Sequence, residues 1–383
     1  MRTLPILGLL LCGLAAAQDA PAPPAPPDVK LTLELREGLS RYHRGELVPV
    51  RLRYSCDVQG KYVKAVSPGD LKNGGEQTLH CEPADSIVPL RATGLDSLRR
   101  FLDTGPGCGF GMGFGSGGCG DCRGFYTLGP VPINFEMNLN RQAGRLGPGH
   151  YACSATAADV APAYPTENRQ ALQLVSNTVS FDVVEDSVWS RAALAEALAQ
   201  IQATCDDVPA PPPGAGTRWL TCNHAAEVLF FLDTDDSLRA AVHLFHGRRD
   251  GRAYWQMEMW DAIARSPNRK LAIELLSQRM SEGDFAVTED VVQALGAWRL
   301  QQRHPDAFAP GAPEVDAAAY HDEAVEILRS LVRTLGESLP GKREEAFGES
   351  VKSYEKLAGW QLCQVGPLIS EPEARATLAA AGR

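Results

Sequence analysis

Residues 179–205 read VSFDVVEDSVWSRAALAEALAQIQATC, and the spacing of their apolar side chains changes midway. Val179, Phe181 and Val183 alternate with polar residues, as in a strand with one buried face. Beyond residue 186 the apolar positions follow one face of a helix, at Leu194, Leu198, Ile201 and Cys205. The stretch therefore predicts a β domain over residues 29–186 followed by an α-helical domain over residues 187–383.

Segments upstream of this boundary repeat the two-residue period. Apolar and polar residues alternate, and Gly, Pro and Asn separate the segments, at residues 29–35, 48–54, 133–139 and 151–155. Several short alternating strands with turn residues between them predict an antiparallel β-sandwich.

Helical stripes continue downstream of the boundary, separated by short polar breaks at residues 232–236 and 265–268. The breaks lie about 32 residues apart, and AVHL (241–244) and AIEL (272–275) occupy matching places after them. This half resembles HEAT-like repeat proteins; an irregular helical bundle is the alternative.

The N-terminus carries the features of an export signal. One arginine precedes an apolar run over residues 4–14, and small residues follow at 15–17. This pattern predicts a signal peptide over residues 1–17 and then a Pro/Ala-rich leader over 18–28. We expect an exported protein, periplasmic or extracellular, with no membrane span after cleavage; an uncleaved anchor is the alternative.

The charge pattern bears on the kind of partner. The chain has a net charge of −10, and acidic and basic residues are interspersed without a basic stripe. This pattern argues against nucleic acid and anionic membranes as partners.

Two cysteines lie in the alternating segments. Cys56 ends one segment, and Cys153 lies in another, two residues after Tyr151. The Tyr-x-Cys pattern resembles the corner of immunoglobulin-like (Ig-like) sandwiches, where two cysteines bridge the sheets. The resemblance implies an Ig-like sandwich with a Cys56–Cys153 disulfide, although no tryptophan lies between these cysteines.

The remaining cysteines extend this disulfide framework, because exported thiols tend to pair. Cys205 and Cys222 fall on the apolar faces of consecutive helices joined by a Pro-rich turn, which predicts a disulfide between them. Cys363 is the expected unpaired thiol. We expect two more bonds, in unknown pairing, among Cys81, Cys108, Cys119 and Cys122.

Two short motifs add a whole-chain resemblance. Residues 44–46 (Arg-Gly-Glu) precede one strand, and residues 148–151 (Pro-Gly-His-Tyr) begin another. With these motifs the chain resembles exported bacterial proteins of unknown function that join an Ig-like sandwich to HEAT-like helices. Such a resemblance implies an architecture and supplies no activity.

The Gly/Cys-rich insert over residues 104–124 reads TGPGCGFGMGFGSGGCGDCRG. A phosphate loop is disfavoured, because it needs a preceding strand and a following helix. A zinc site would use Cys108, Cys119 and Cys122, but a second Cys-x-x-Cys is missing. A Cys-Gly-Asp-Cys redox pair would need a helix that the glycines disfavour.

We therefore interpret the insert as a surface loop held by disulfides. Its apolar side chains form a candidate binding tip, or else they pack over the edge of the sandwich. These side chains are Phe110, Met112, Phe114 and Phe125.

Sequence motifs for catalysis are missing. The chain has no H-E-x-x-H, and Gly-x-Ser-x-Gly fails around Ser116. His243 with His246, and His224 with Glu227, are spaced as helical pairs and are weak metal candidates.

We expect a non-catalytic protein- or peptide-binding or scaffolding protein with no metal and no cofactor. One alternative is a metal- or thiol-dependent enzyme that uses the insert or the His243–His246 pair. The second alternative is a sandwich resembling proteinase inhibitors.

Overall fold

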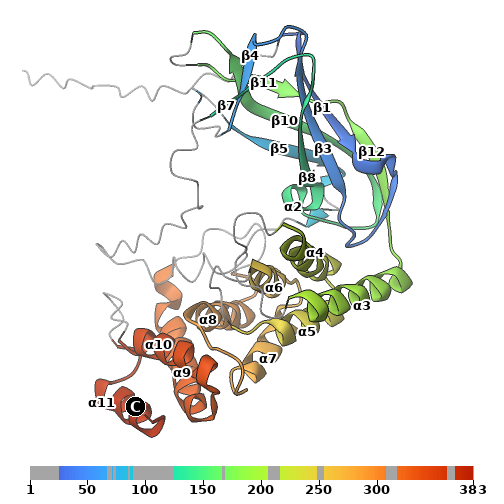
Figure 1. Ribbon diagram of the computed structural model, residues 1–383. Coiled ribbons are helices and arrows are strands. Elements are labelled where there is room, and N and C mark those ends of the chain that lie inside the picture. Colours follow the sequence, from blue (N-terminus) through green and yellow to red (C-terminus); the bar gives the residue numbers. More distant parts are fainter. Residues whose placement is uncertain are drawn as a thin grey trace, which may run out of the picture.

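The computed structural model describes residues 26–66, 71, 75–84, 87–88, 124–165, 169–205, 216–247, 254–307, 317–359 and 367–382. Strands occupy the N-terminal half and helices the C-terminal half (Figure 1), which confirms the predicted order of β then α. The predicted signal peptide, most of the leader and the insert up to residue 123 lie outside the described residues. No described helix is both long and apolar enough to cross a membrane.

The smaller sheet of the β half contains three antiparallel strands. Their order is β1-β3-β8, with bounds β1 (Val29–Leu35), β3 (Pro49–Cys56) and β8 (Ile133–Asn138). Along β3, buried residues alternate with partly exposed ones, as the sequence predicts. Each strand therefore turns one apolar face toward the second sheet.

The larger sheet is built around one long strand, β10 (Gly149–Pro162), and its main path runs β2-β12-β10-β4-β7. Two further strands also pair with β10, β5 (Gly75–Glu82) and β11 (Leu172–Val175). The other members of the path are β2 (Arg41–His43), β12 (Val179–Val184), β4 (Tyr62–Ala65) and β7 (Phe125–Thr127). All pairs are antiparallel except β12 with β2.

Buried side chains from both sheets form one core. Leu33 and Tyr54 of the smaller sheet share it with Tyr151 and Phe181 of the larger one. The Tyr151 hydroxyl donates a 2.7 Å hydrogen bond to the carbonyl of Gly147 and so fixes the start of β10. Strands β6 (Ile87–Val88) and β9 (Arg145–Leu146) form a separate two-stranded sheet. This sheet and helix α2 (Leu139–Ala143) complete the β half.

The disulfide pattern corrects two predictions. Cys153 bonds Cys81, which lies directly opposite it on β5 with the two Cα atoms 4.1 Å apart. Cys56 is a buried free thiol at the end of β3, in the other sheet, and its Sγ lies 3.2 Å from the Val58 carbonyl oxygen. The Cys56–Cys153 prediction is therefore wrong, and so is the inclusion of Cys81 among the cysteines of the two remaining bonds.

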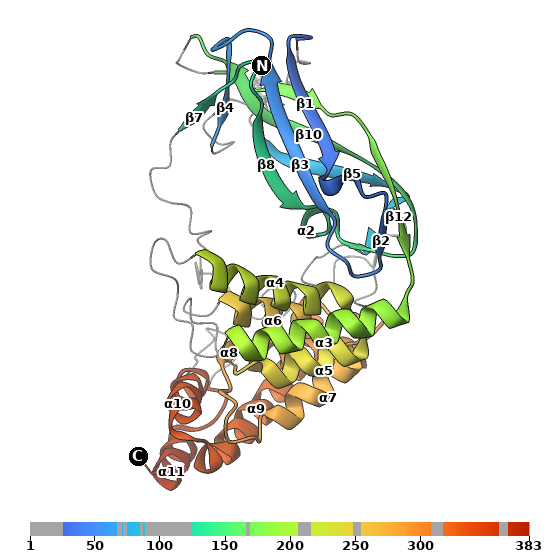
Figure 2. The ribbon, with the colours of Figure 1, turned by 45° about the vertical axis from the view of Figure 1, so that its right-hand side comes forward.

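The helical half begins directly after the sheets, since β12 ends at Val184 and α3 begins at Ser187. Helices α4, α6 and α8 form one layer, and α3, α5 and α7 form a second (Figure 2). The bounds are α3 (Ser187–Thr204), α4 (Gly216–Leu232), α5 (Asp235–Leu244), α6 (Tyr254–Ala264), α7 (Arg269–Arg279), α8 (Glu289–Arg303), α9 (His321–Ser338), α10 (Glu344–Ala358) and α11 (Glu371–Ala380). The predicted Cys205–Cys222 disulfide ties α3 to α4.

Aromatic stacking and buried cations hold together helices that are not adjacent in the sequence. Trp260 of α6 stacks on Trp298 of α8, with ring centroids 6.5 Å apart. Arg279 donates to the carbonyls that end α5, and Lys342 donates to the carbonyl of Met280 at the end of α7. A cation at a helix C-terminus satisfies free carbonyls and opposes the helix dipole. Burial lowers the pKa of Lys342 to about 8.

Candidate functional site

The two halves meet at the turn between β2 and β3, where Gly45 lies against the end of α4. Gly45 has φ +85°, a conformation that favours glycine, and an added Cβ would lie 2.8 Å from the Leu232 Cα. The glycine of the Arg-Gly-Glu motif is therefore required by backbone conformation and by close contact with the helical half.

The flanking residues hold this turn in place. The backbone N–H of His43 donates a 2.7 Å hydrogen bond to Glu46 Oε2. Arg44 pairs with Glu185 at 3.1 Å, and its N–H donates to the carbonyl of Val184. The turn is thus tied to the end of β12, immediately before α3.

A second set of contacts reaches from the β half into the helices. Arg145 of β9 is buried and donates to the carbonyl of Arg265 at 2.6 Å, and it lies 3.5 Å from Asp233. Its guanidinium lies 4.8 Å from the ring centroid of Phe230. Burial lowers the pKa of Arg145 and raises that of Asp233 to about 6.

Arg141 of α2 makes the third contact between the halves. It pairs with Glu227 of α4 and, at 2.6 Å, with Glu258 of α6. Asn138 Nδ2 donates a 3.1 Å hydrogen bond to the same Glu227 carboxylate. Polar contacts at several separate points therefore fix the β half on the first helices.

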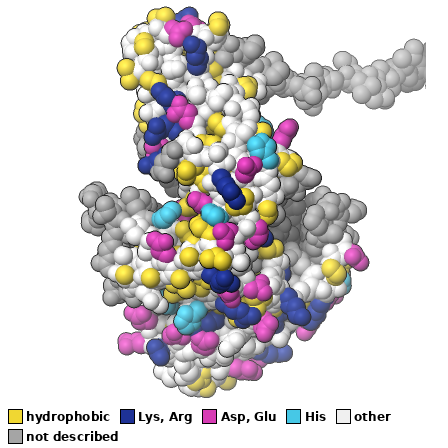
Figure 3. Space-filling model, turned by 90° about the vertical axis from the view of Figure 1, so that its right-hand side faces the viewer, with side chains coloured by type: hydrophobic (Ala, Val, Ile, Leu, Met, Phe, Trp, Pro, Cys, Tyr) yellow, Lys and Arg dark blue, Asp and Glu magenta, His cyan; other side chains and the backbone are white. Residues whose placement is uncertain are grey.

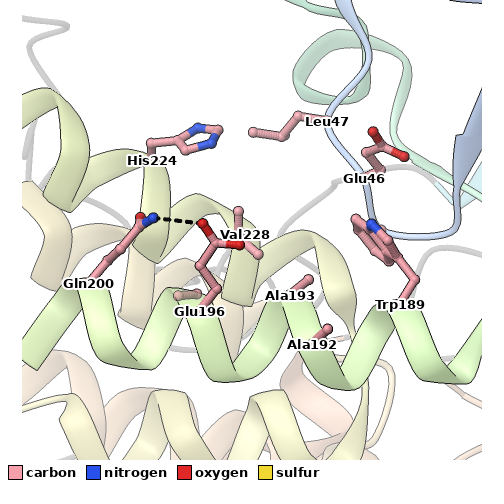
Figure 4. Close-up of a pocket in the computed structure, with 11 residues that line it drawn as sticks. Glu46, Leu47, Trp189, Ala192, Ala193, Glu196, Gln200, His224 and Val228 are labelled. Carbon is pink, nitrogen blue, oxygen red and sulfur yellow. Dashed lines mark hydrogen bonds between the residues drawn. The ribbon is translucent and has the colours of Figure 1, made fainter.

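A pocket of about 430 Å³ opens at this junction, and we call it the junction pocket (Figure 4). Its walls come from the β2–β3 turn on one side and from α3 and α4 on the other. The lining residues are Gly45, Glu46, Leu47, Trp189, Ala192, Ala193, Glu196, Ala197, Gln200, His224 and Val228.

The pocket combines apolar walls with a few polar groups. Leu47, Val228 and the alanines supply apolar surface, whereas Glu46, Glu196, Gln200 and His224 supply polar atoms. Gln200 donates to Glu196 at 3.1 Å, one turn along α3 (Figure 4). A concave apolar surface with a few placed polar groups is typical of a binding site.

Trp189 is held rigidly at one end of the pocket. Its ring stacks on His43, with centroids 4.8 Å apart and an interplanar angle of 7°. Asp186 caps the start of α3 and accepts hydrogen bonds from the N–H groups of Val188 and Trp189. These N–H groups are the main cause of the lowered pKa of Asp186.

The surface on the side of α3 and β12 is mixed in character. Hydrophobic side chains gather where the strands meet the helices, and acidic, basic and histidine side chains lie among them (Figure 3). The exposed apolar residues there include Val188, which precedes Trp189 in α3.

The predicted binding tip lies mostly beyond the described part of the chain, which includes neither Phe110, Met112 and Phe114 nor the candidate ligands Cys108, Cys119 and Cys122. Cys363 is also outside it. Phe125 is described: it begins β7, is 39% exposed, and lies under the Arg169 guanidinium at 4.3 Å from the ring centroid.

The two histidine pairs that the sequence suggests lie in different surroundings. His243 and His246 are both exposed, and His246 lies edge-on to Trp255. His224 lines the junction pocket, whereas Glu227 is buried in its contacts with Arg141 and Asn138. Within the described ranges, no group of three or more His, Cys, Asp or Glu side chains is placed to hold a metal ion.

Sequence reasoning did not identify the junction pocket. The sequence signals were the Arg-Gly-Glu motif and a tryptophan three residues into the first long helix. No protein-family model matches this chain, and a search of curated proteins finds no significant match.

Proposed function

We propose that this protein is a non-catalytic, exported binding protein that holds a protein or peptide partner in the junction pocket. In this proposal an Ig-like sandwich and HEAT-like helices form one composite binding surface. The Tyr151–Gly147 hydrogen bond and the two-layered helices support these fold assignments. The predicted signal peptide and the two disulfides among the described residues support export.

The observation that carries the proposal is that both halves build the walls of one pocket. Leu47 comes from the β half, and Trp189 and Val228 come from the helical half. The contacts of Arg141 and Arg145 fix these walls relative to one another, so the pocket exists before a partner arrives. A preformed pocket loses less conformational entropy when it binds.

The test is selection of a displayed random peptide library against the mature protein. Ala193 lines the pocket and Ala195 of the same helix is exposed outside it, so Ala193→Trp fills the pocket and Ala195→Trp is the matched control. The proposal predicts peptides that bind the wild type and the control variant but not Ala193→Trp. Failure to enrich any peptide, or equal binding to all three proteins, would overturn it.

A further inference from the structure

The charge of the junction pocket points to one kind of side chain. Its lining includes Glu46 and Glu196 but neither lysine nor arginine. We infer that the pocket takes a lysine side chain of the partner peptide. This inference rests on the proposed function and adds a ligand class to it.

Both carboxylates retain capacity to accept a cation. Glu46 accepts the His43 N–H through Oε2, and Glu196 accepts the Gln200 amide through Oε1. Among the described residues, the second oxygen of each carboxylate has no hydrogen-bond partner. An ammonium group entering the pocket therefore gains charge-assisted hydrogen bonds without breaking those already formed.

The apolar walls suit the stem of the same side chain. Leu47, Val228 and Ala193 present aliphatic surface between the polar groups (Figure 4). A lysine buries its four methylene groups along apolar surface and keeps its ammonium at polar atoms. An acidic side chain in the same place would face two like charges.

The arrangement favours lysine over arginine. A guanidinium gains most from a carboxylate with both oxygens open, because it binds as a planar two-pronged donor. Here each carboxylate already has one oxygen in use. A compact ammonium needs only a single oxygen, which either Glu46 or Glu196 offers, since the two carboxylates lie at different places in the pocket (Figure 4).

The experiment uses four pentapeptides, Ac-Gly-Gly-X-Gly-Gly-NH2, in which X is lysine, norleucine, arginine or glutamate. Binding to the full mature protein is followed by NMR titration of the Trp189 indole N–H, assigned through Trp189→Phe. At low ionic strength we expect lysine to bind roughly twofold to fivefold more tightly than norleucine, the range for one partly exposed ion pair. Raising the salt should reduce this preference.

Charge-neutral variants provide the control. The double variant Glu46→Gln, Glu196→Gln should bind lysine and norleucine peptides about equally, because the amides keep the hydrogen bonds but not the charge. Glu274→Gln, on the exposed face of α7, should keep the wild-type preference.

The outcomes separate the two proposals. Equal binding of lysine and norleucine, or arginine binding as tightly as lysine, would overturn the lysine inference. If either result were obtained while Ala193→Trp still abolished binding of the library-selected peptides, the proposed function would stand. Library-selected peptides that bind the Ala193→Trp variant as tightly as the wild type would overturn the proposed function itself.

Discussion

Removing the carboxylate of Asp159 should strongly destabilise the β half. Asp159 of β10 pairs with Lys64 of β4 at 3.0 Å, and both side chains are almost completely buried. The Tyr54 hydroxyl and the Gln77 amide donate to the same carboxylate oxygen, Oδ2. Lys64 Nζ also lies 4.5 Å from the ring centroid of Phe135. Asp159→Leu would leave the buried Lys64 ammonium without its counter-charge, and the Tyr54 hydroxyl and the half-buried Gln77 amide without this acceptor.

The expected loss follows from the burial of these groups. Breaking a buried ion pair by removing one partner typically costs about 3–5 kcal/mol, because the remaining charge is uncompensated. We therefore expect Asp159→Leu to lower the free energy of unfolding by about 3–5 kcal/mol.

The double variant Lys64→Met, Asp159→Leu provides the control. It removes both charges and fills the space with apolar side chains, so it should recover most of the loss. Urea unfolding at pH 7, followed by circular dichroism with the disulfides intact, measures all three proteins. An Asp159→Leu variant within about 1 kcal/mol of the wild type, or a double variant as unstable as the single one, would refute this reasoning.

Three further predictions concern the junction and the disulfides. Gly45→Ala should cost about 2–4 kcal/mol in urea unfolding, because backbone strain at φ +85° adds to a clash with α4. The control Gly38→Ala, at φ +66° in open space, should cost only about 1 kcal/mol of strain. Equal losses for the two variants would contradict the contact between Gly45 and α4. The double substitution of Cys81 and Cys153 by serine opens a loop with a sequence separation of 72 and should cost about 4 kcal/mol in thermal or urea unfolding, while an unchanged midpoint would mean that the bond does not form. The pKa of Asp233, raised by burial to about 6 from 3.8, makes stability fall as pH rises from about 4 to about 6, because the unfolded chain loses this proton first. Asp233→Asn should remove up to about 3 kcal/mol of that loss in unfolding curves against pH, and an unaltered pH dependence would contradict the assignment.

Much of the fold was readable from periodicity because one face of each strand or helix is buried. β1, β3 and β12 alternate cleanly; α4 and α6 end at the two polar breaks in the sequence, and α5 and α7 begin there. β4 gave no such signal, since all four of its residues are buried. The edge strand β7 also gave no alternating pattern, because all of its residues are exposed.

The disulfides show where local patterns stop being sufficient. Cys205 and Cys222 lie on adjacent helices, so their pairing follows from the helical period and a short connection. Cys153 pairs with Cys81 because the register of β10 against β5 places them opposite one another. Register is set by the packing of the whole sheet, so the local sequence around each cysteine does not show which residues lie opposite one another.

The junction pocket was unpredictable for a related reason. Glu46 and Glu196 lie far apart in the sequence, and each looks like an ordinary surface residue in its own segment. Only the docking of the β2–β3 turn on α3 and α4 brings them to one cavity. The Arg-Gly-Glu motif marked the turn that makes this contact, but it did not show that the turn packs on α3 and α4.

The most direct test of the account is the affinity of one library-selected peptide for three proteins, measured by calorimetry. Binding in the junction pocket predicts equal affinities for the wild type and Ala195→Trp, and at least a roughly tenfold loss, about 1.4 kcal/mol, for Ala193→Trp. Equal affinities for all three proteins would show that the junction pocket is not where this protein holds its partner.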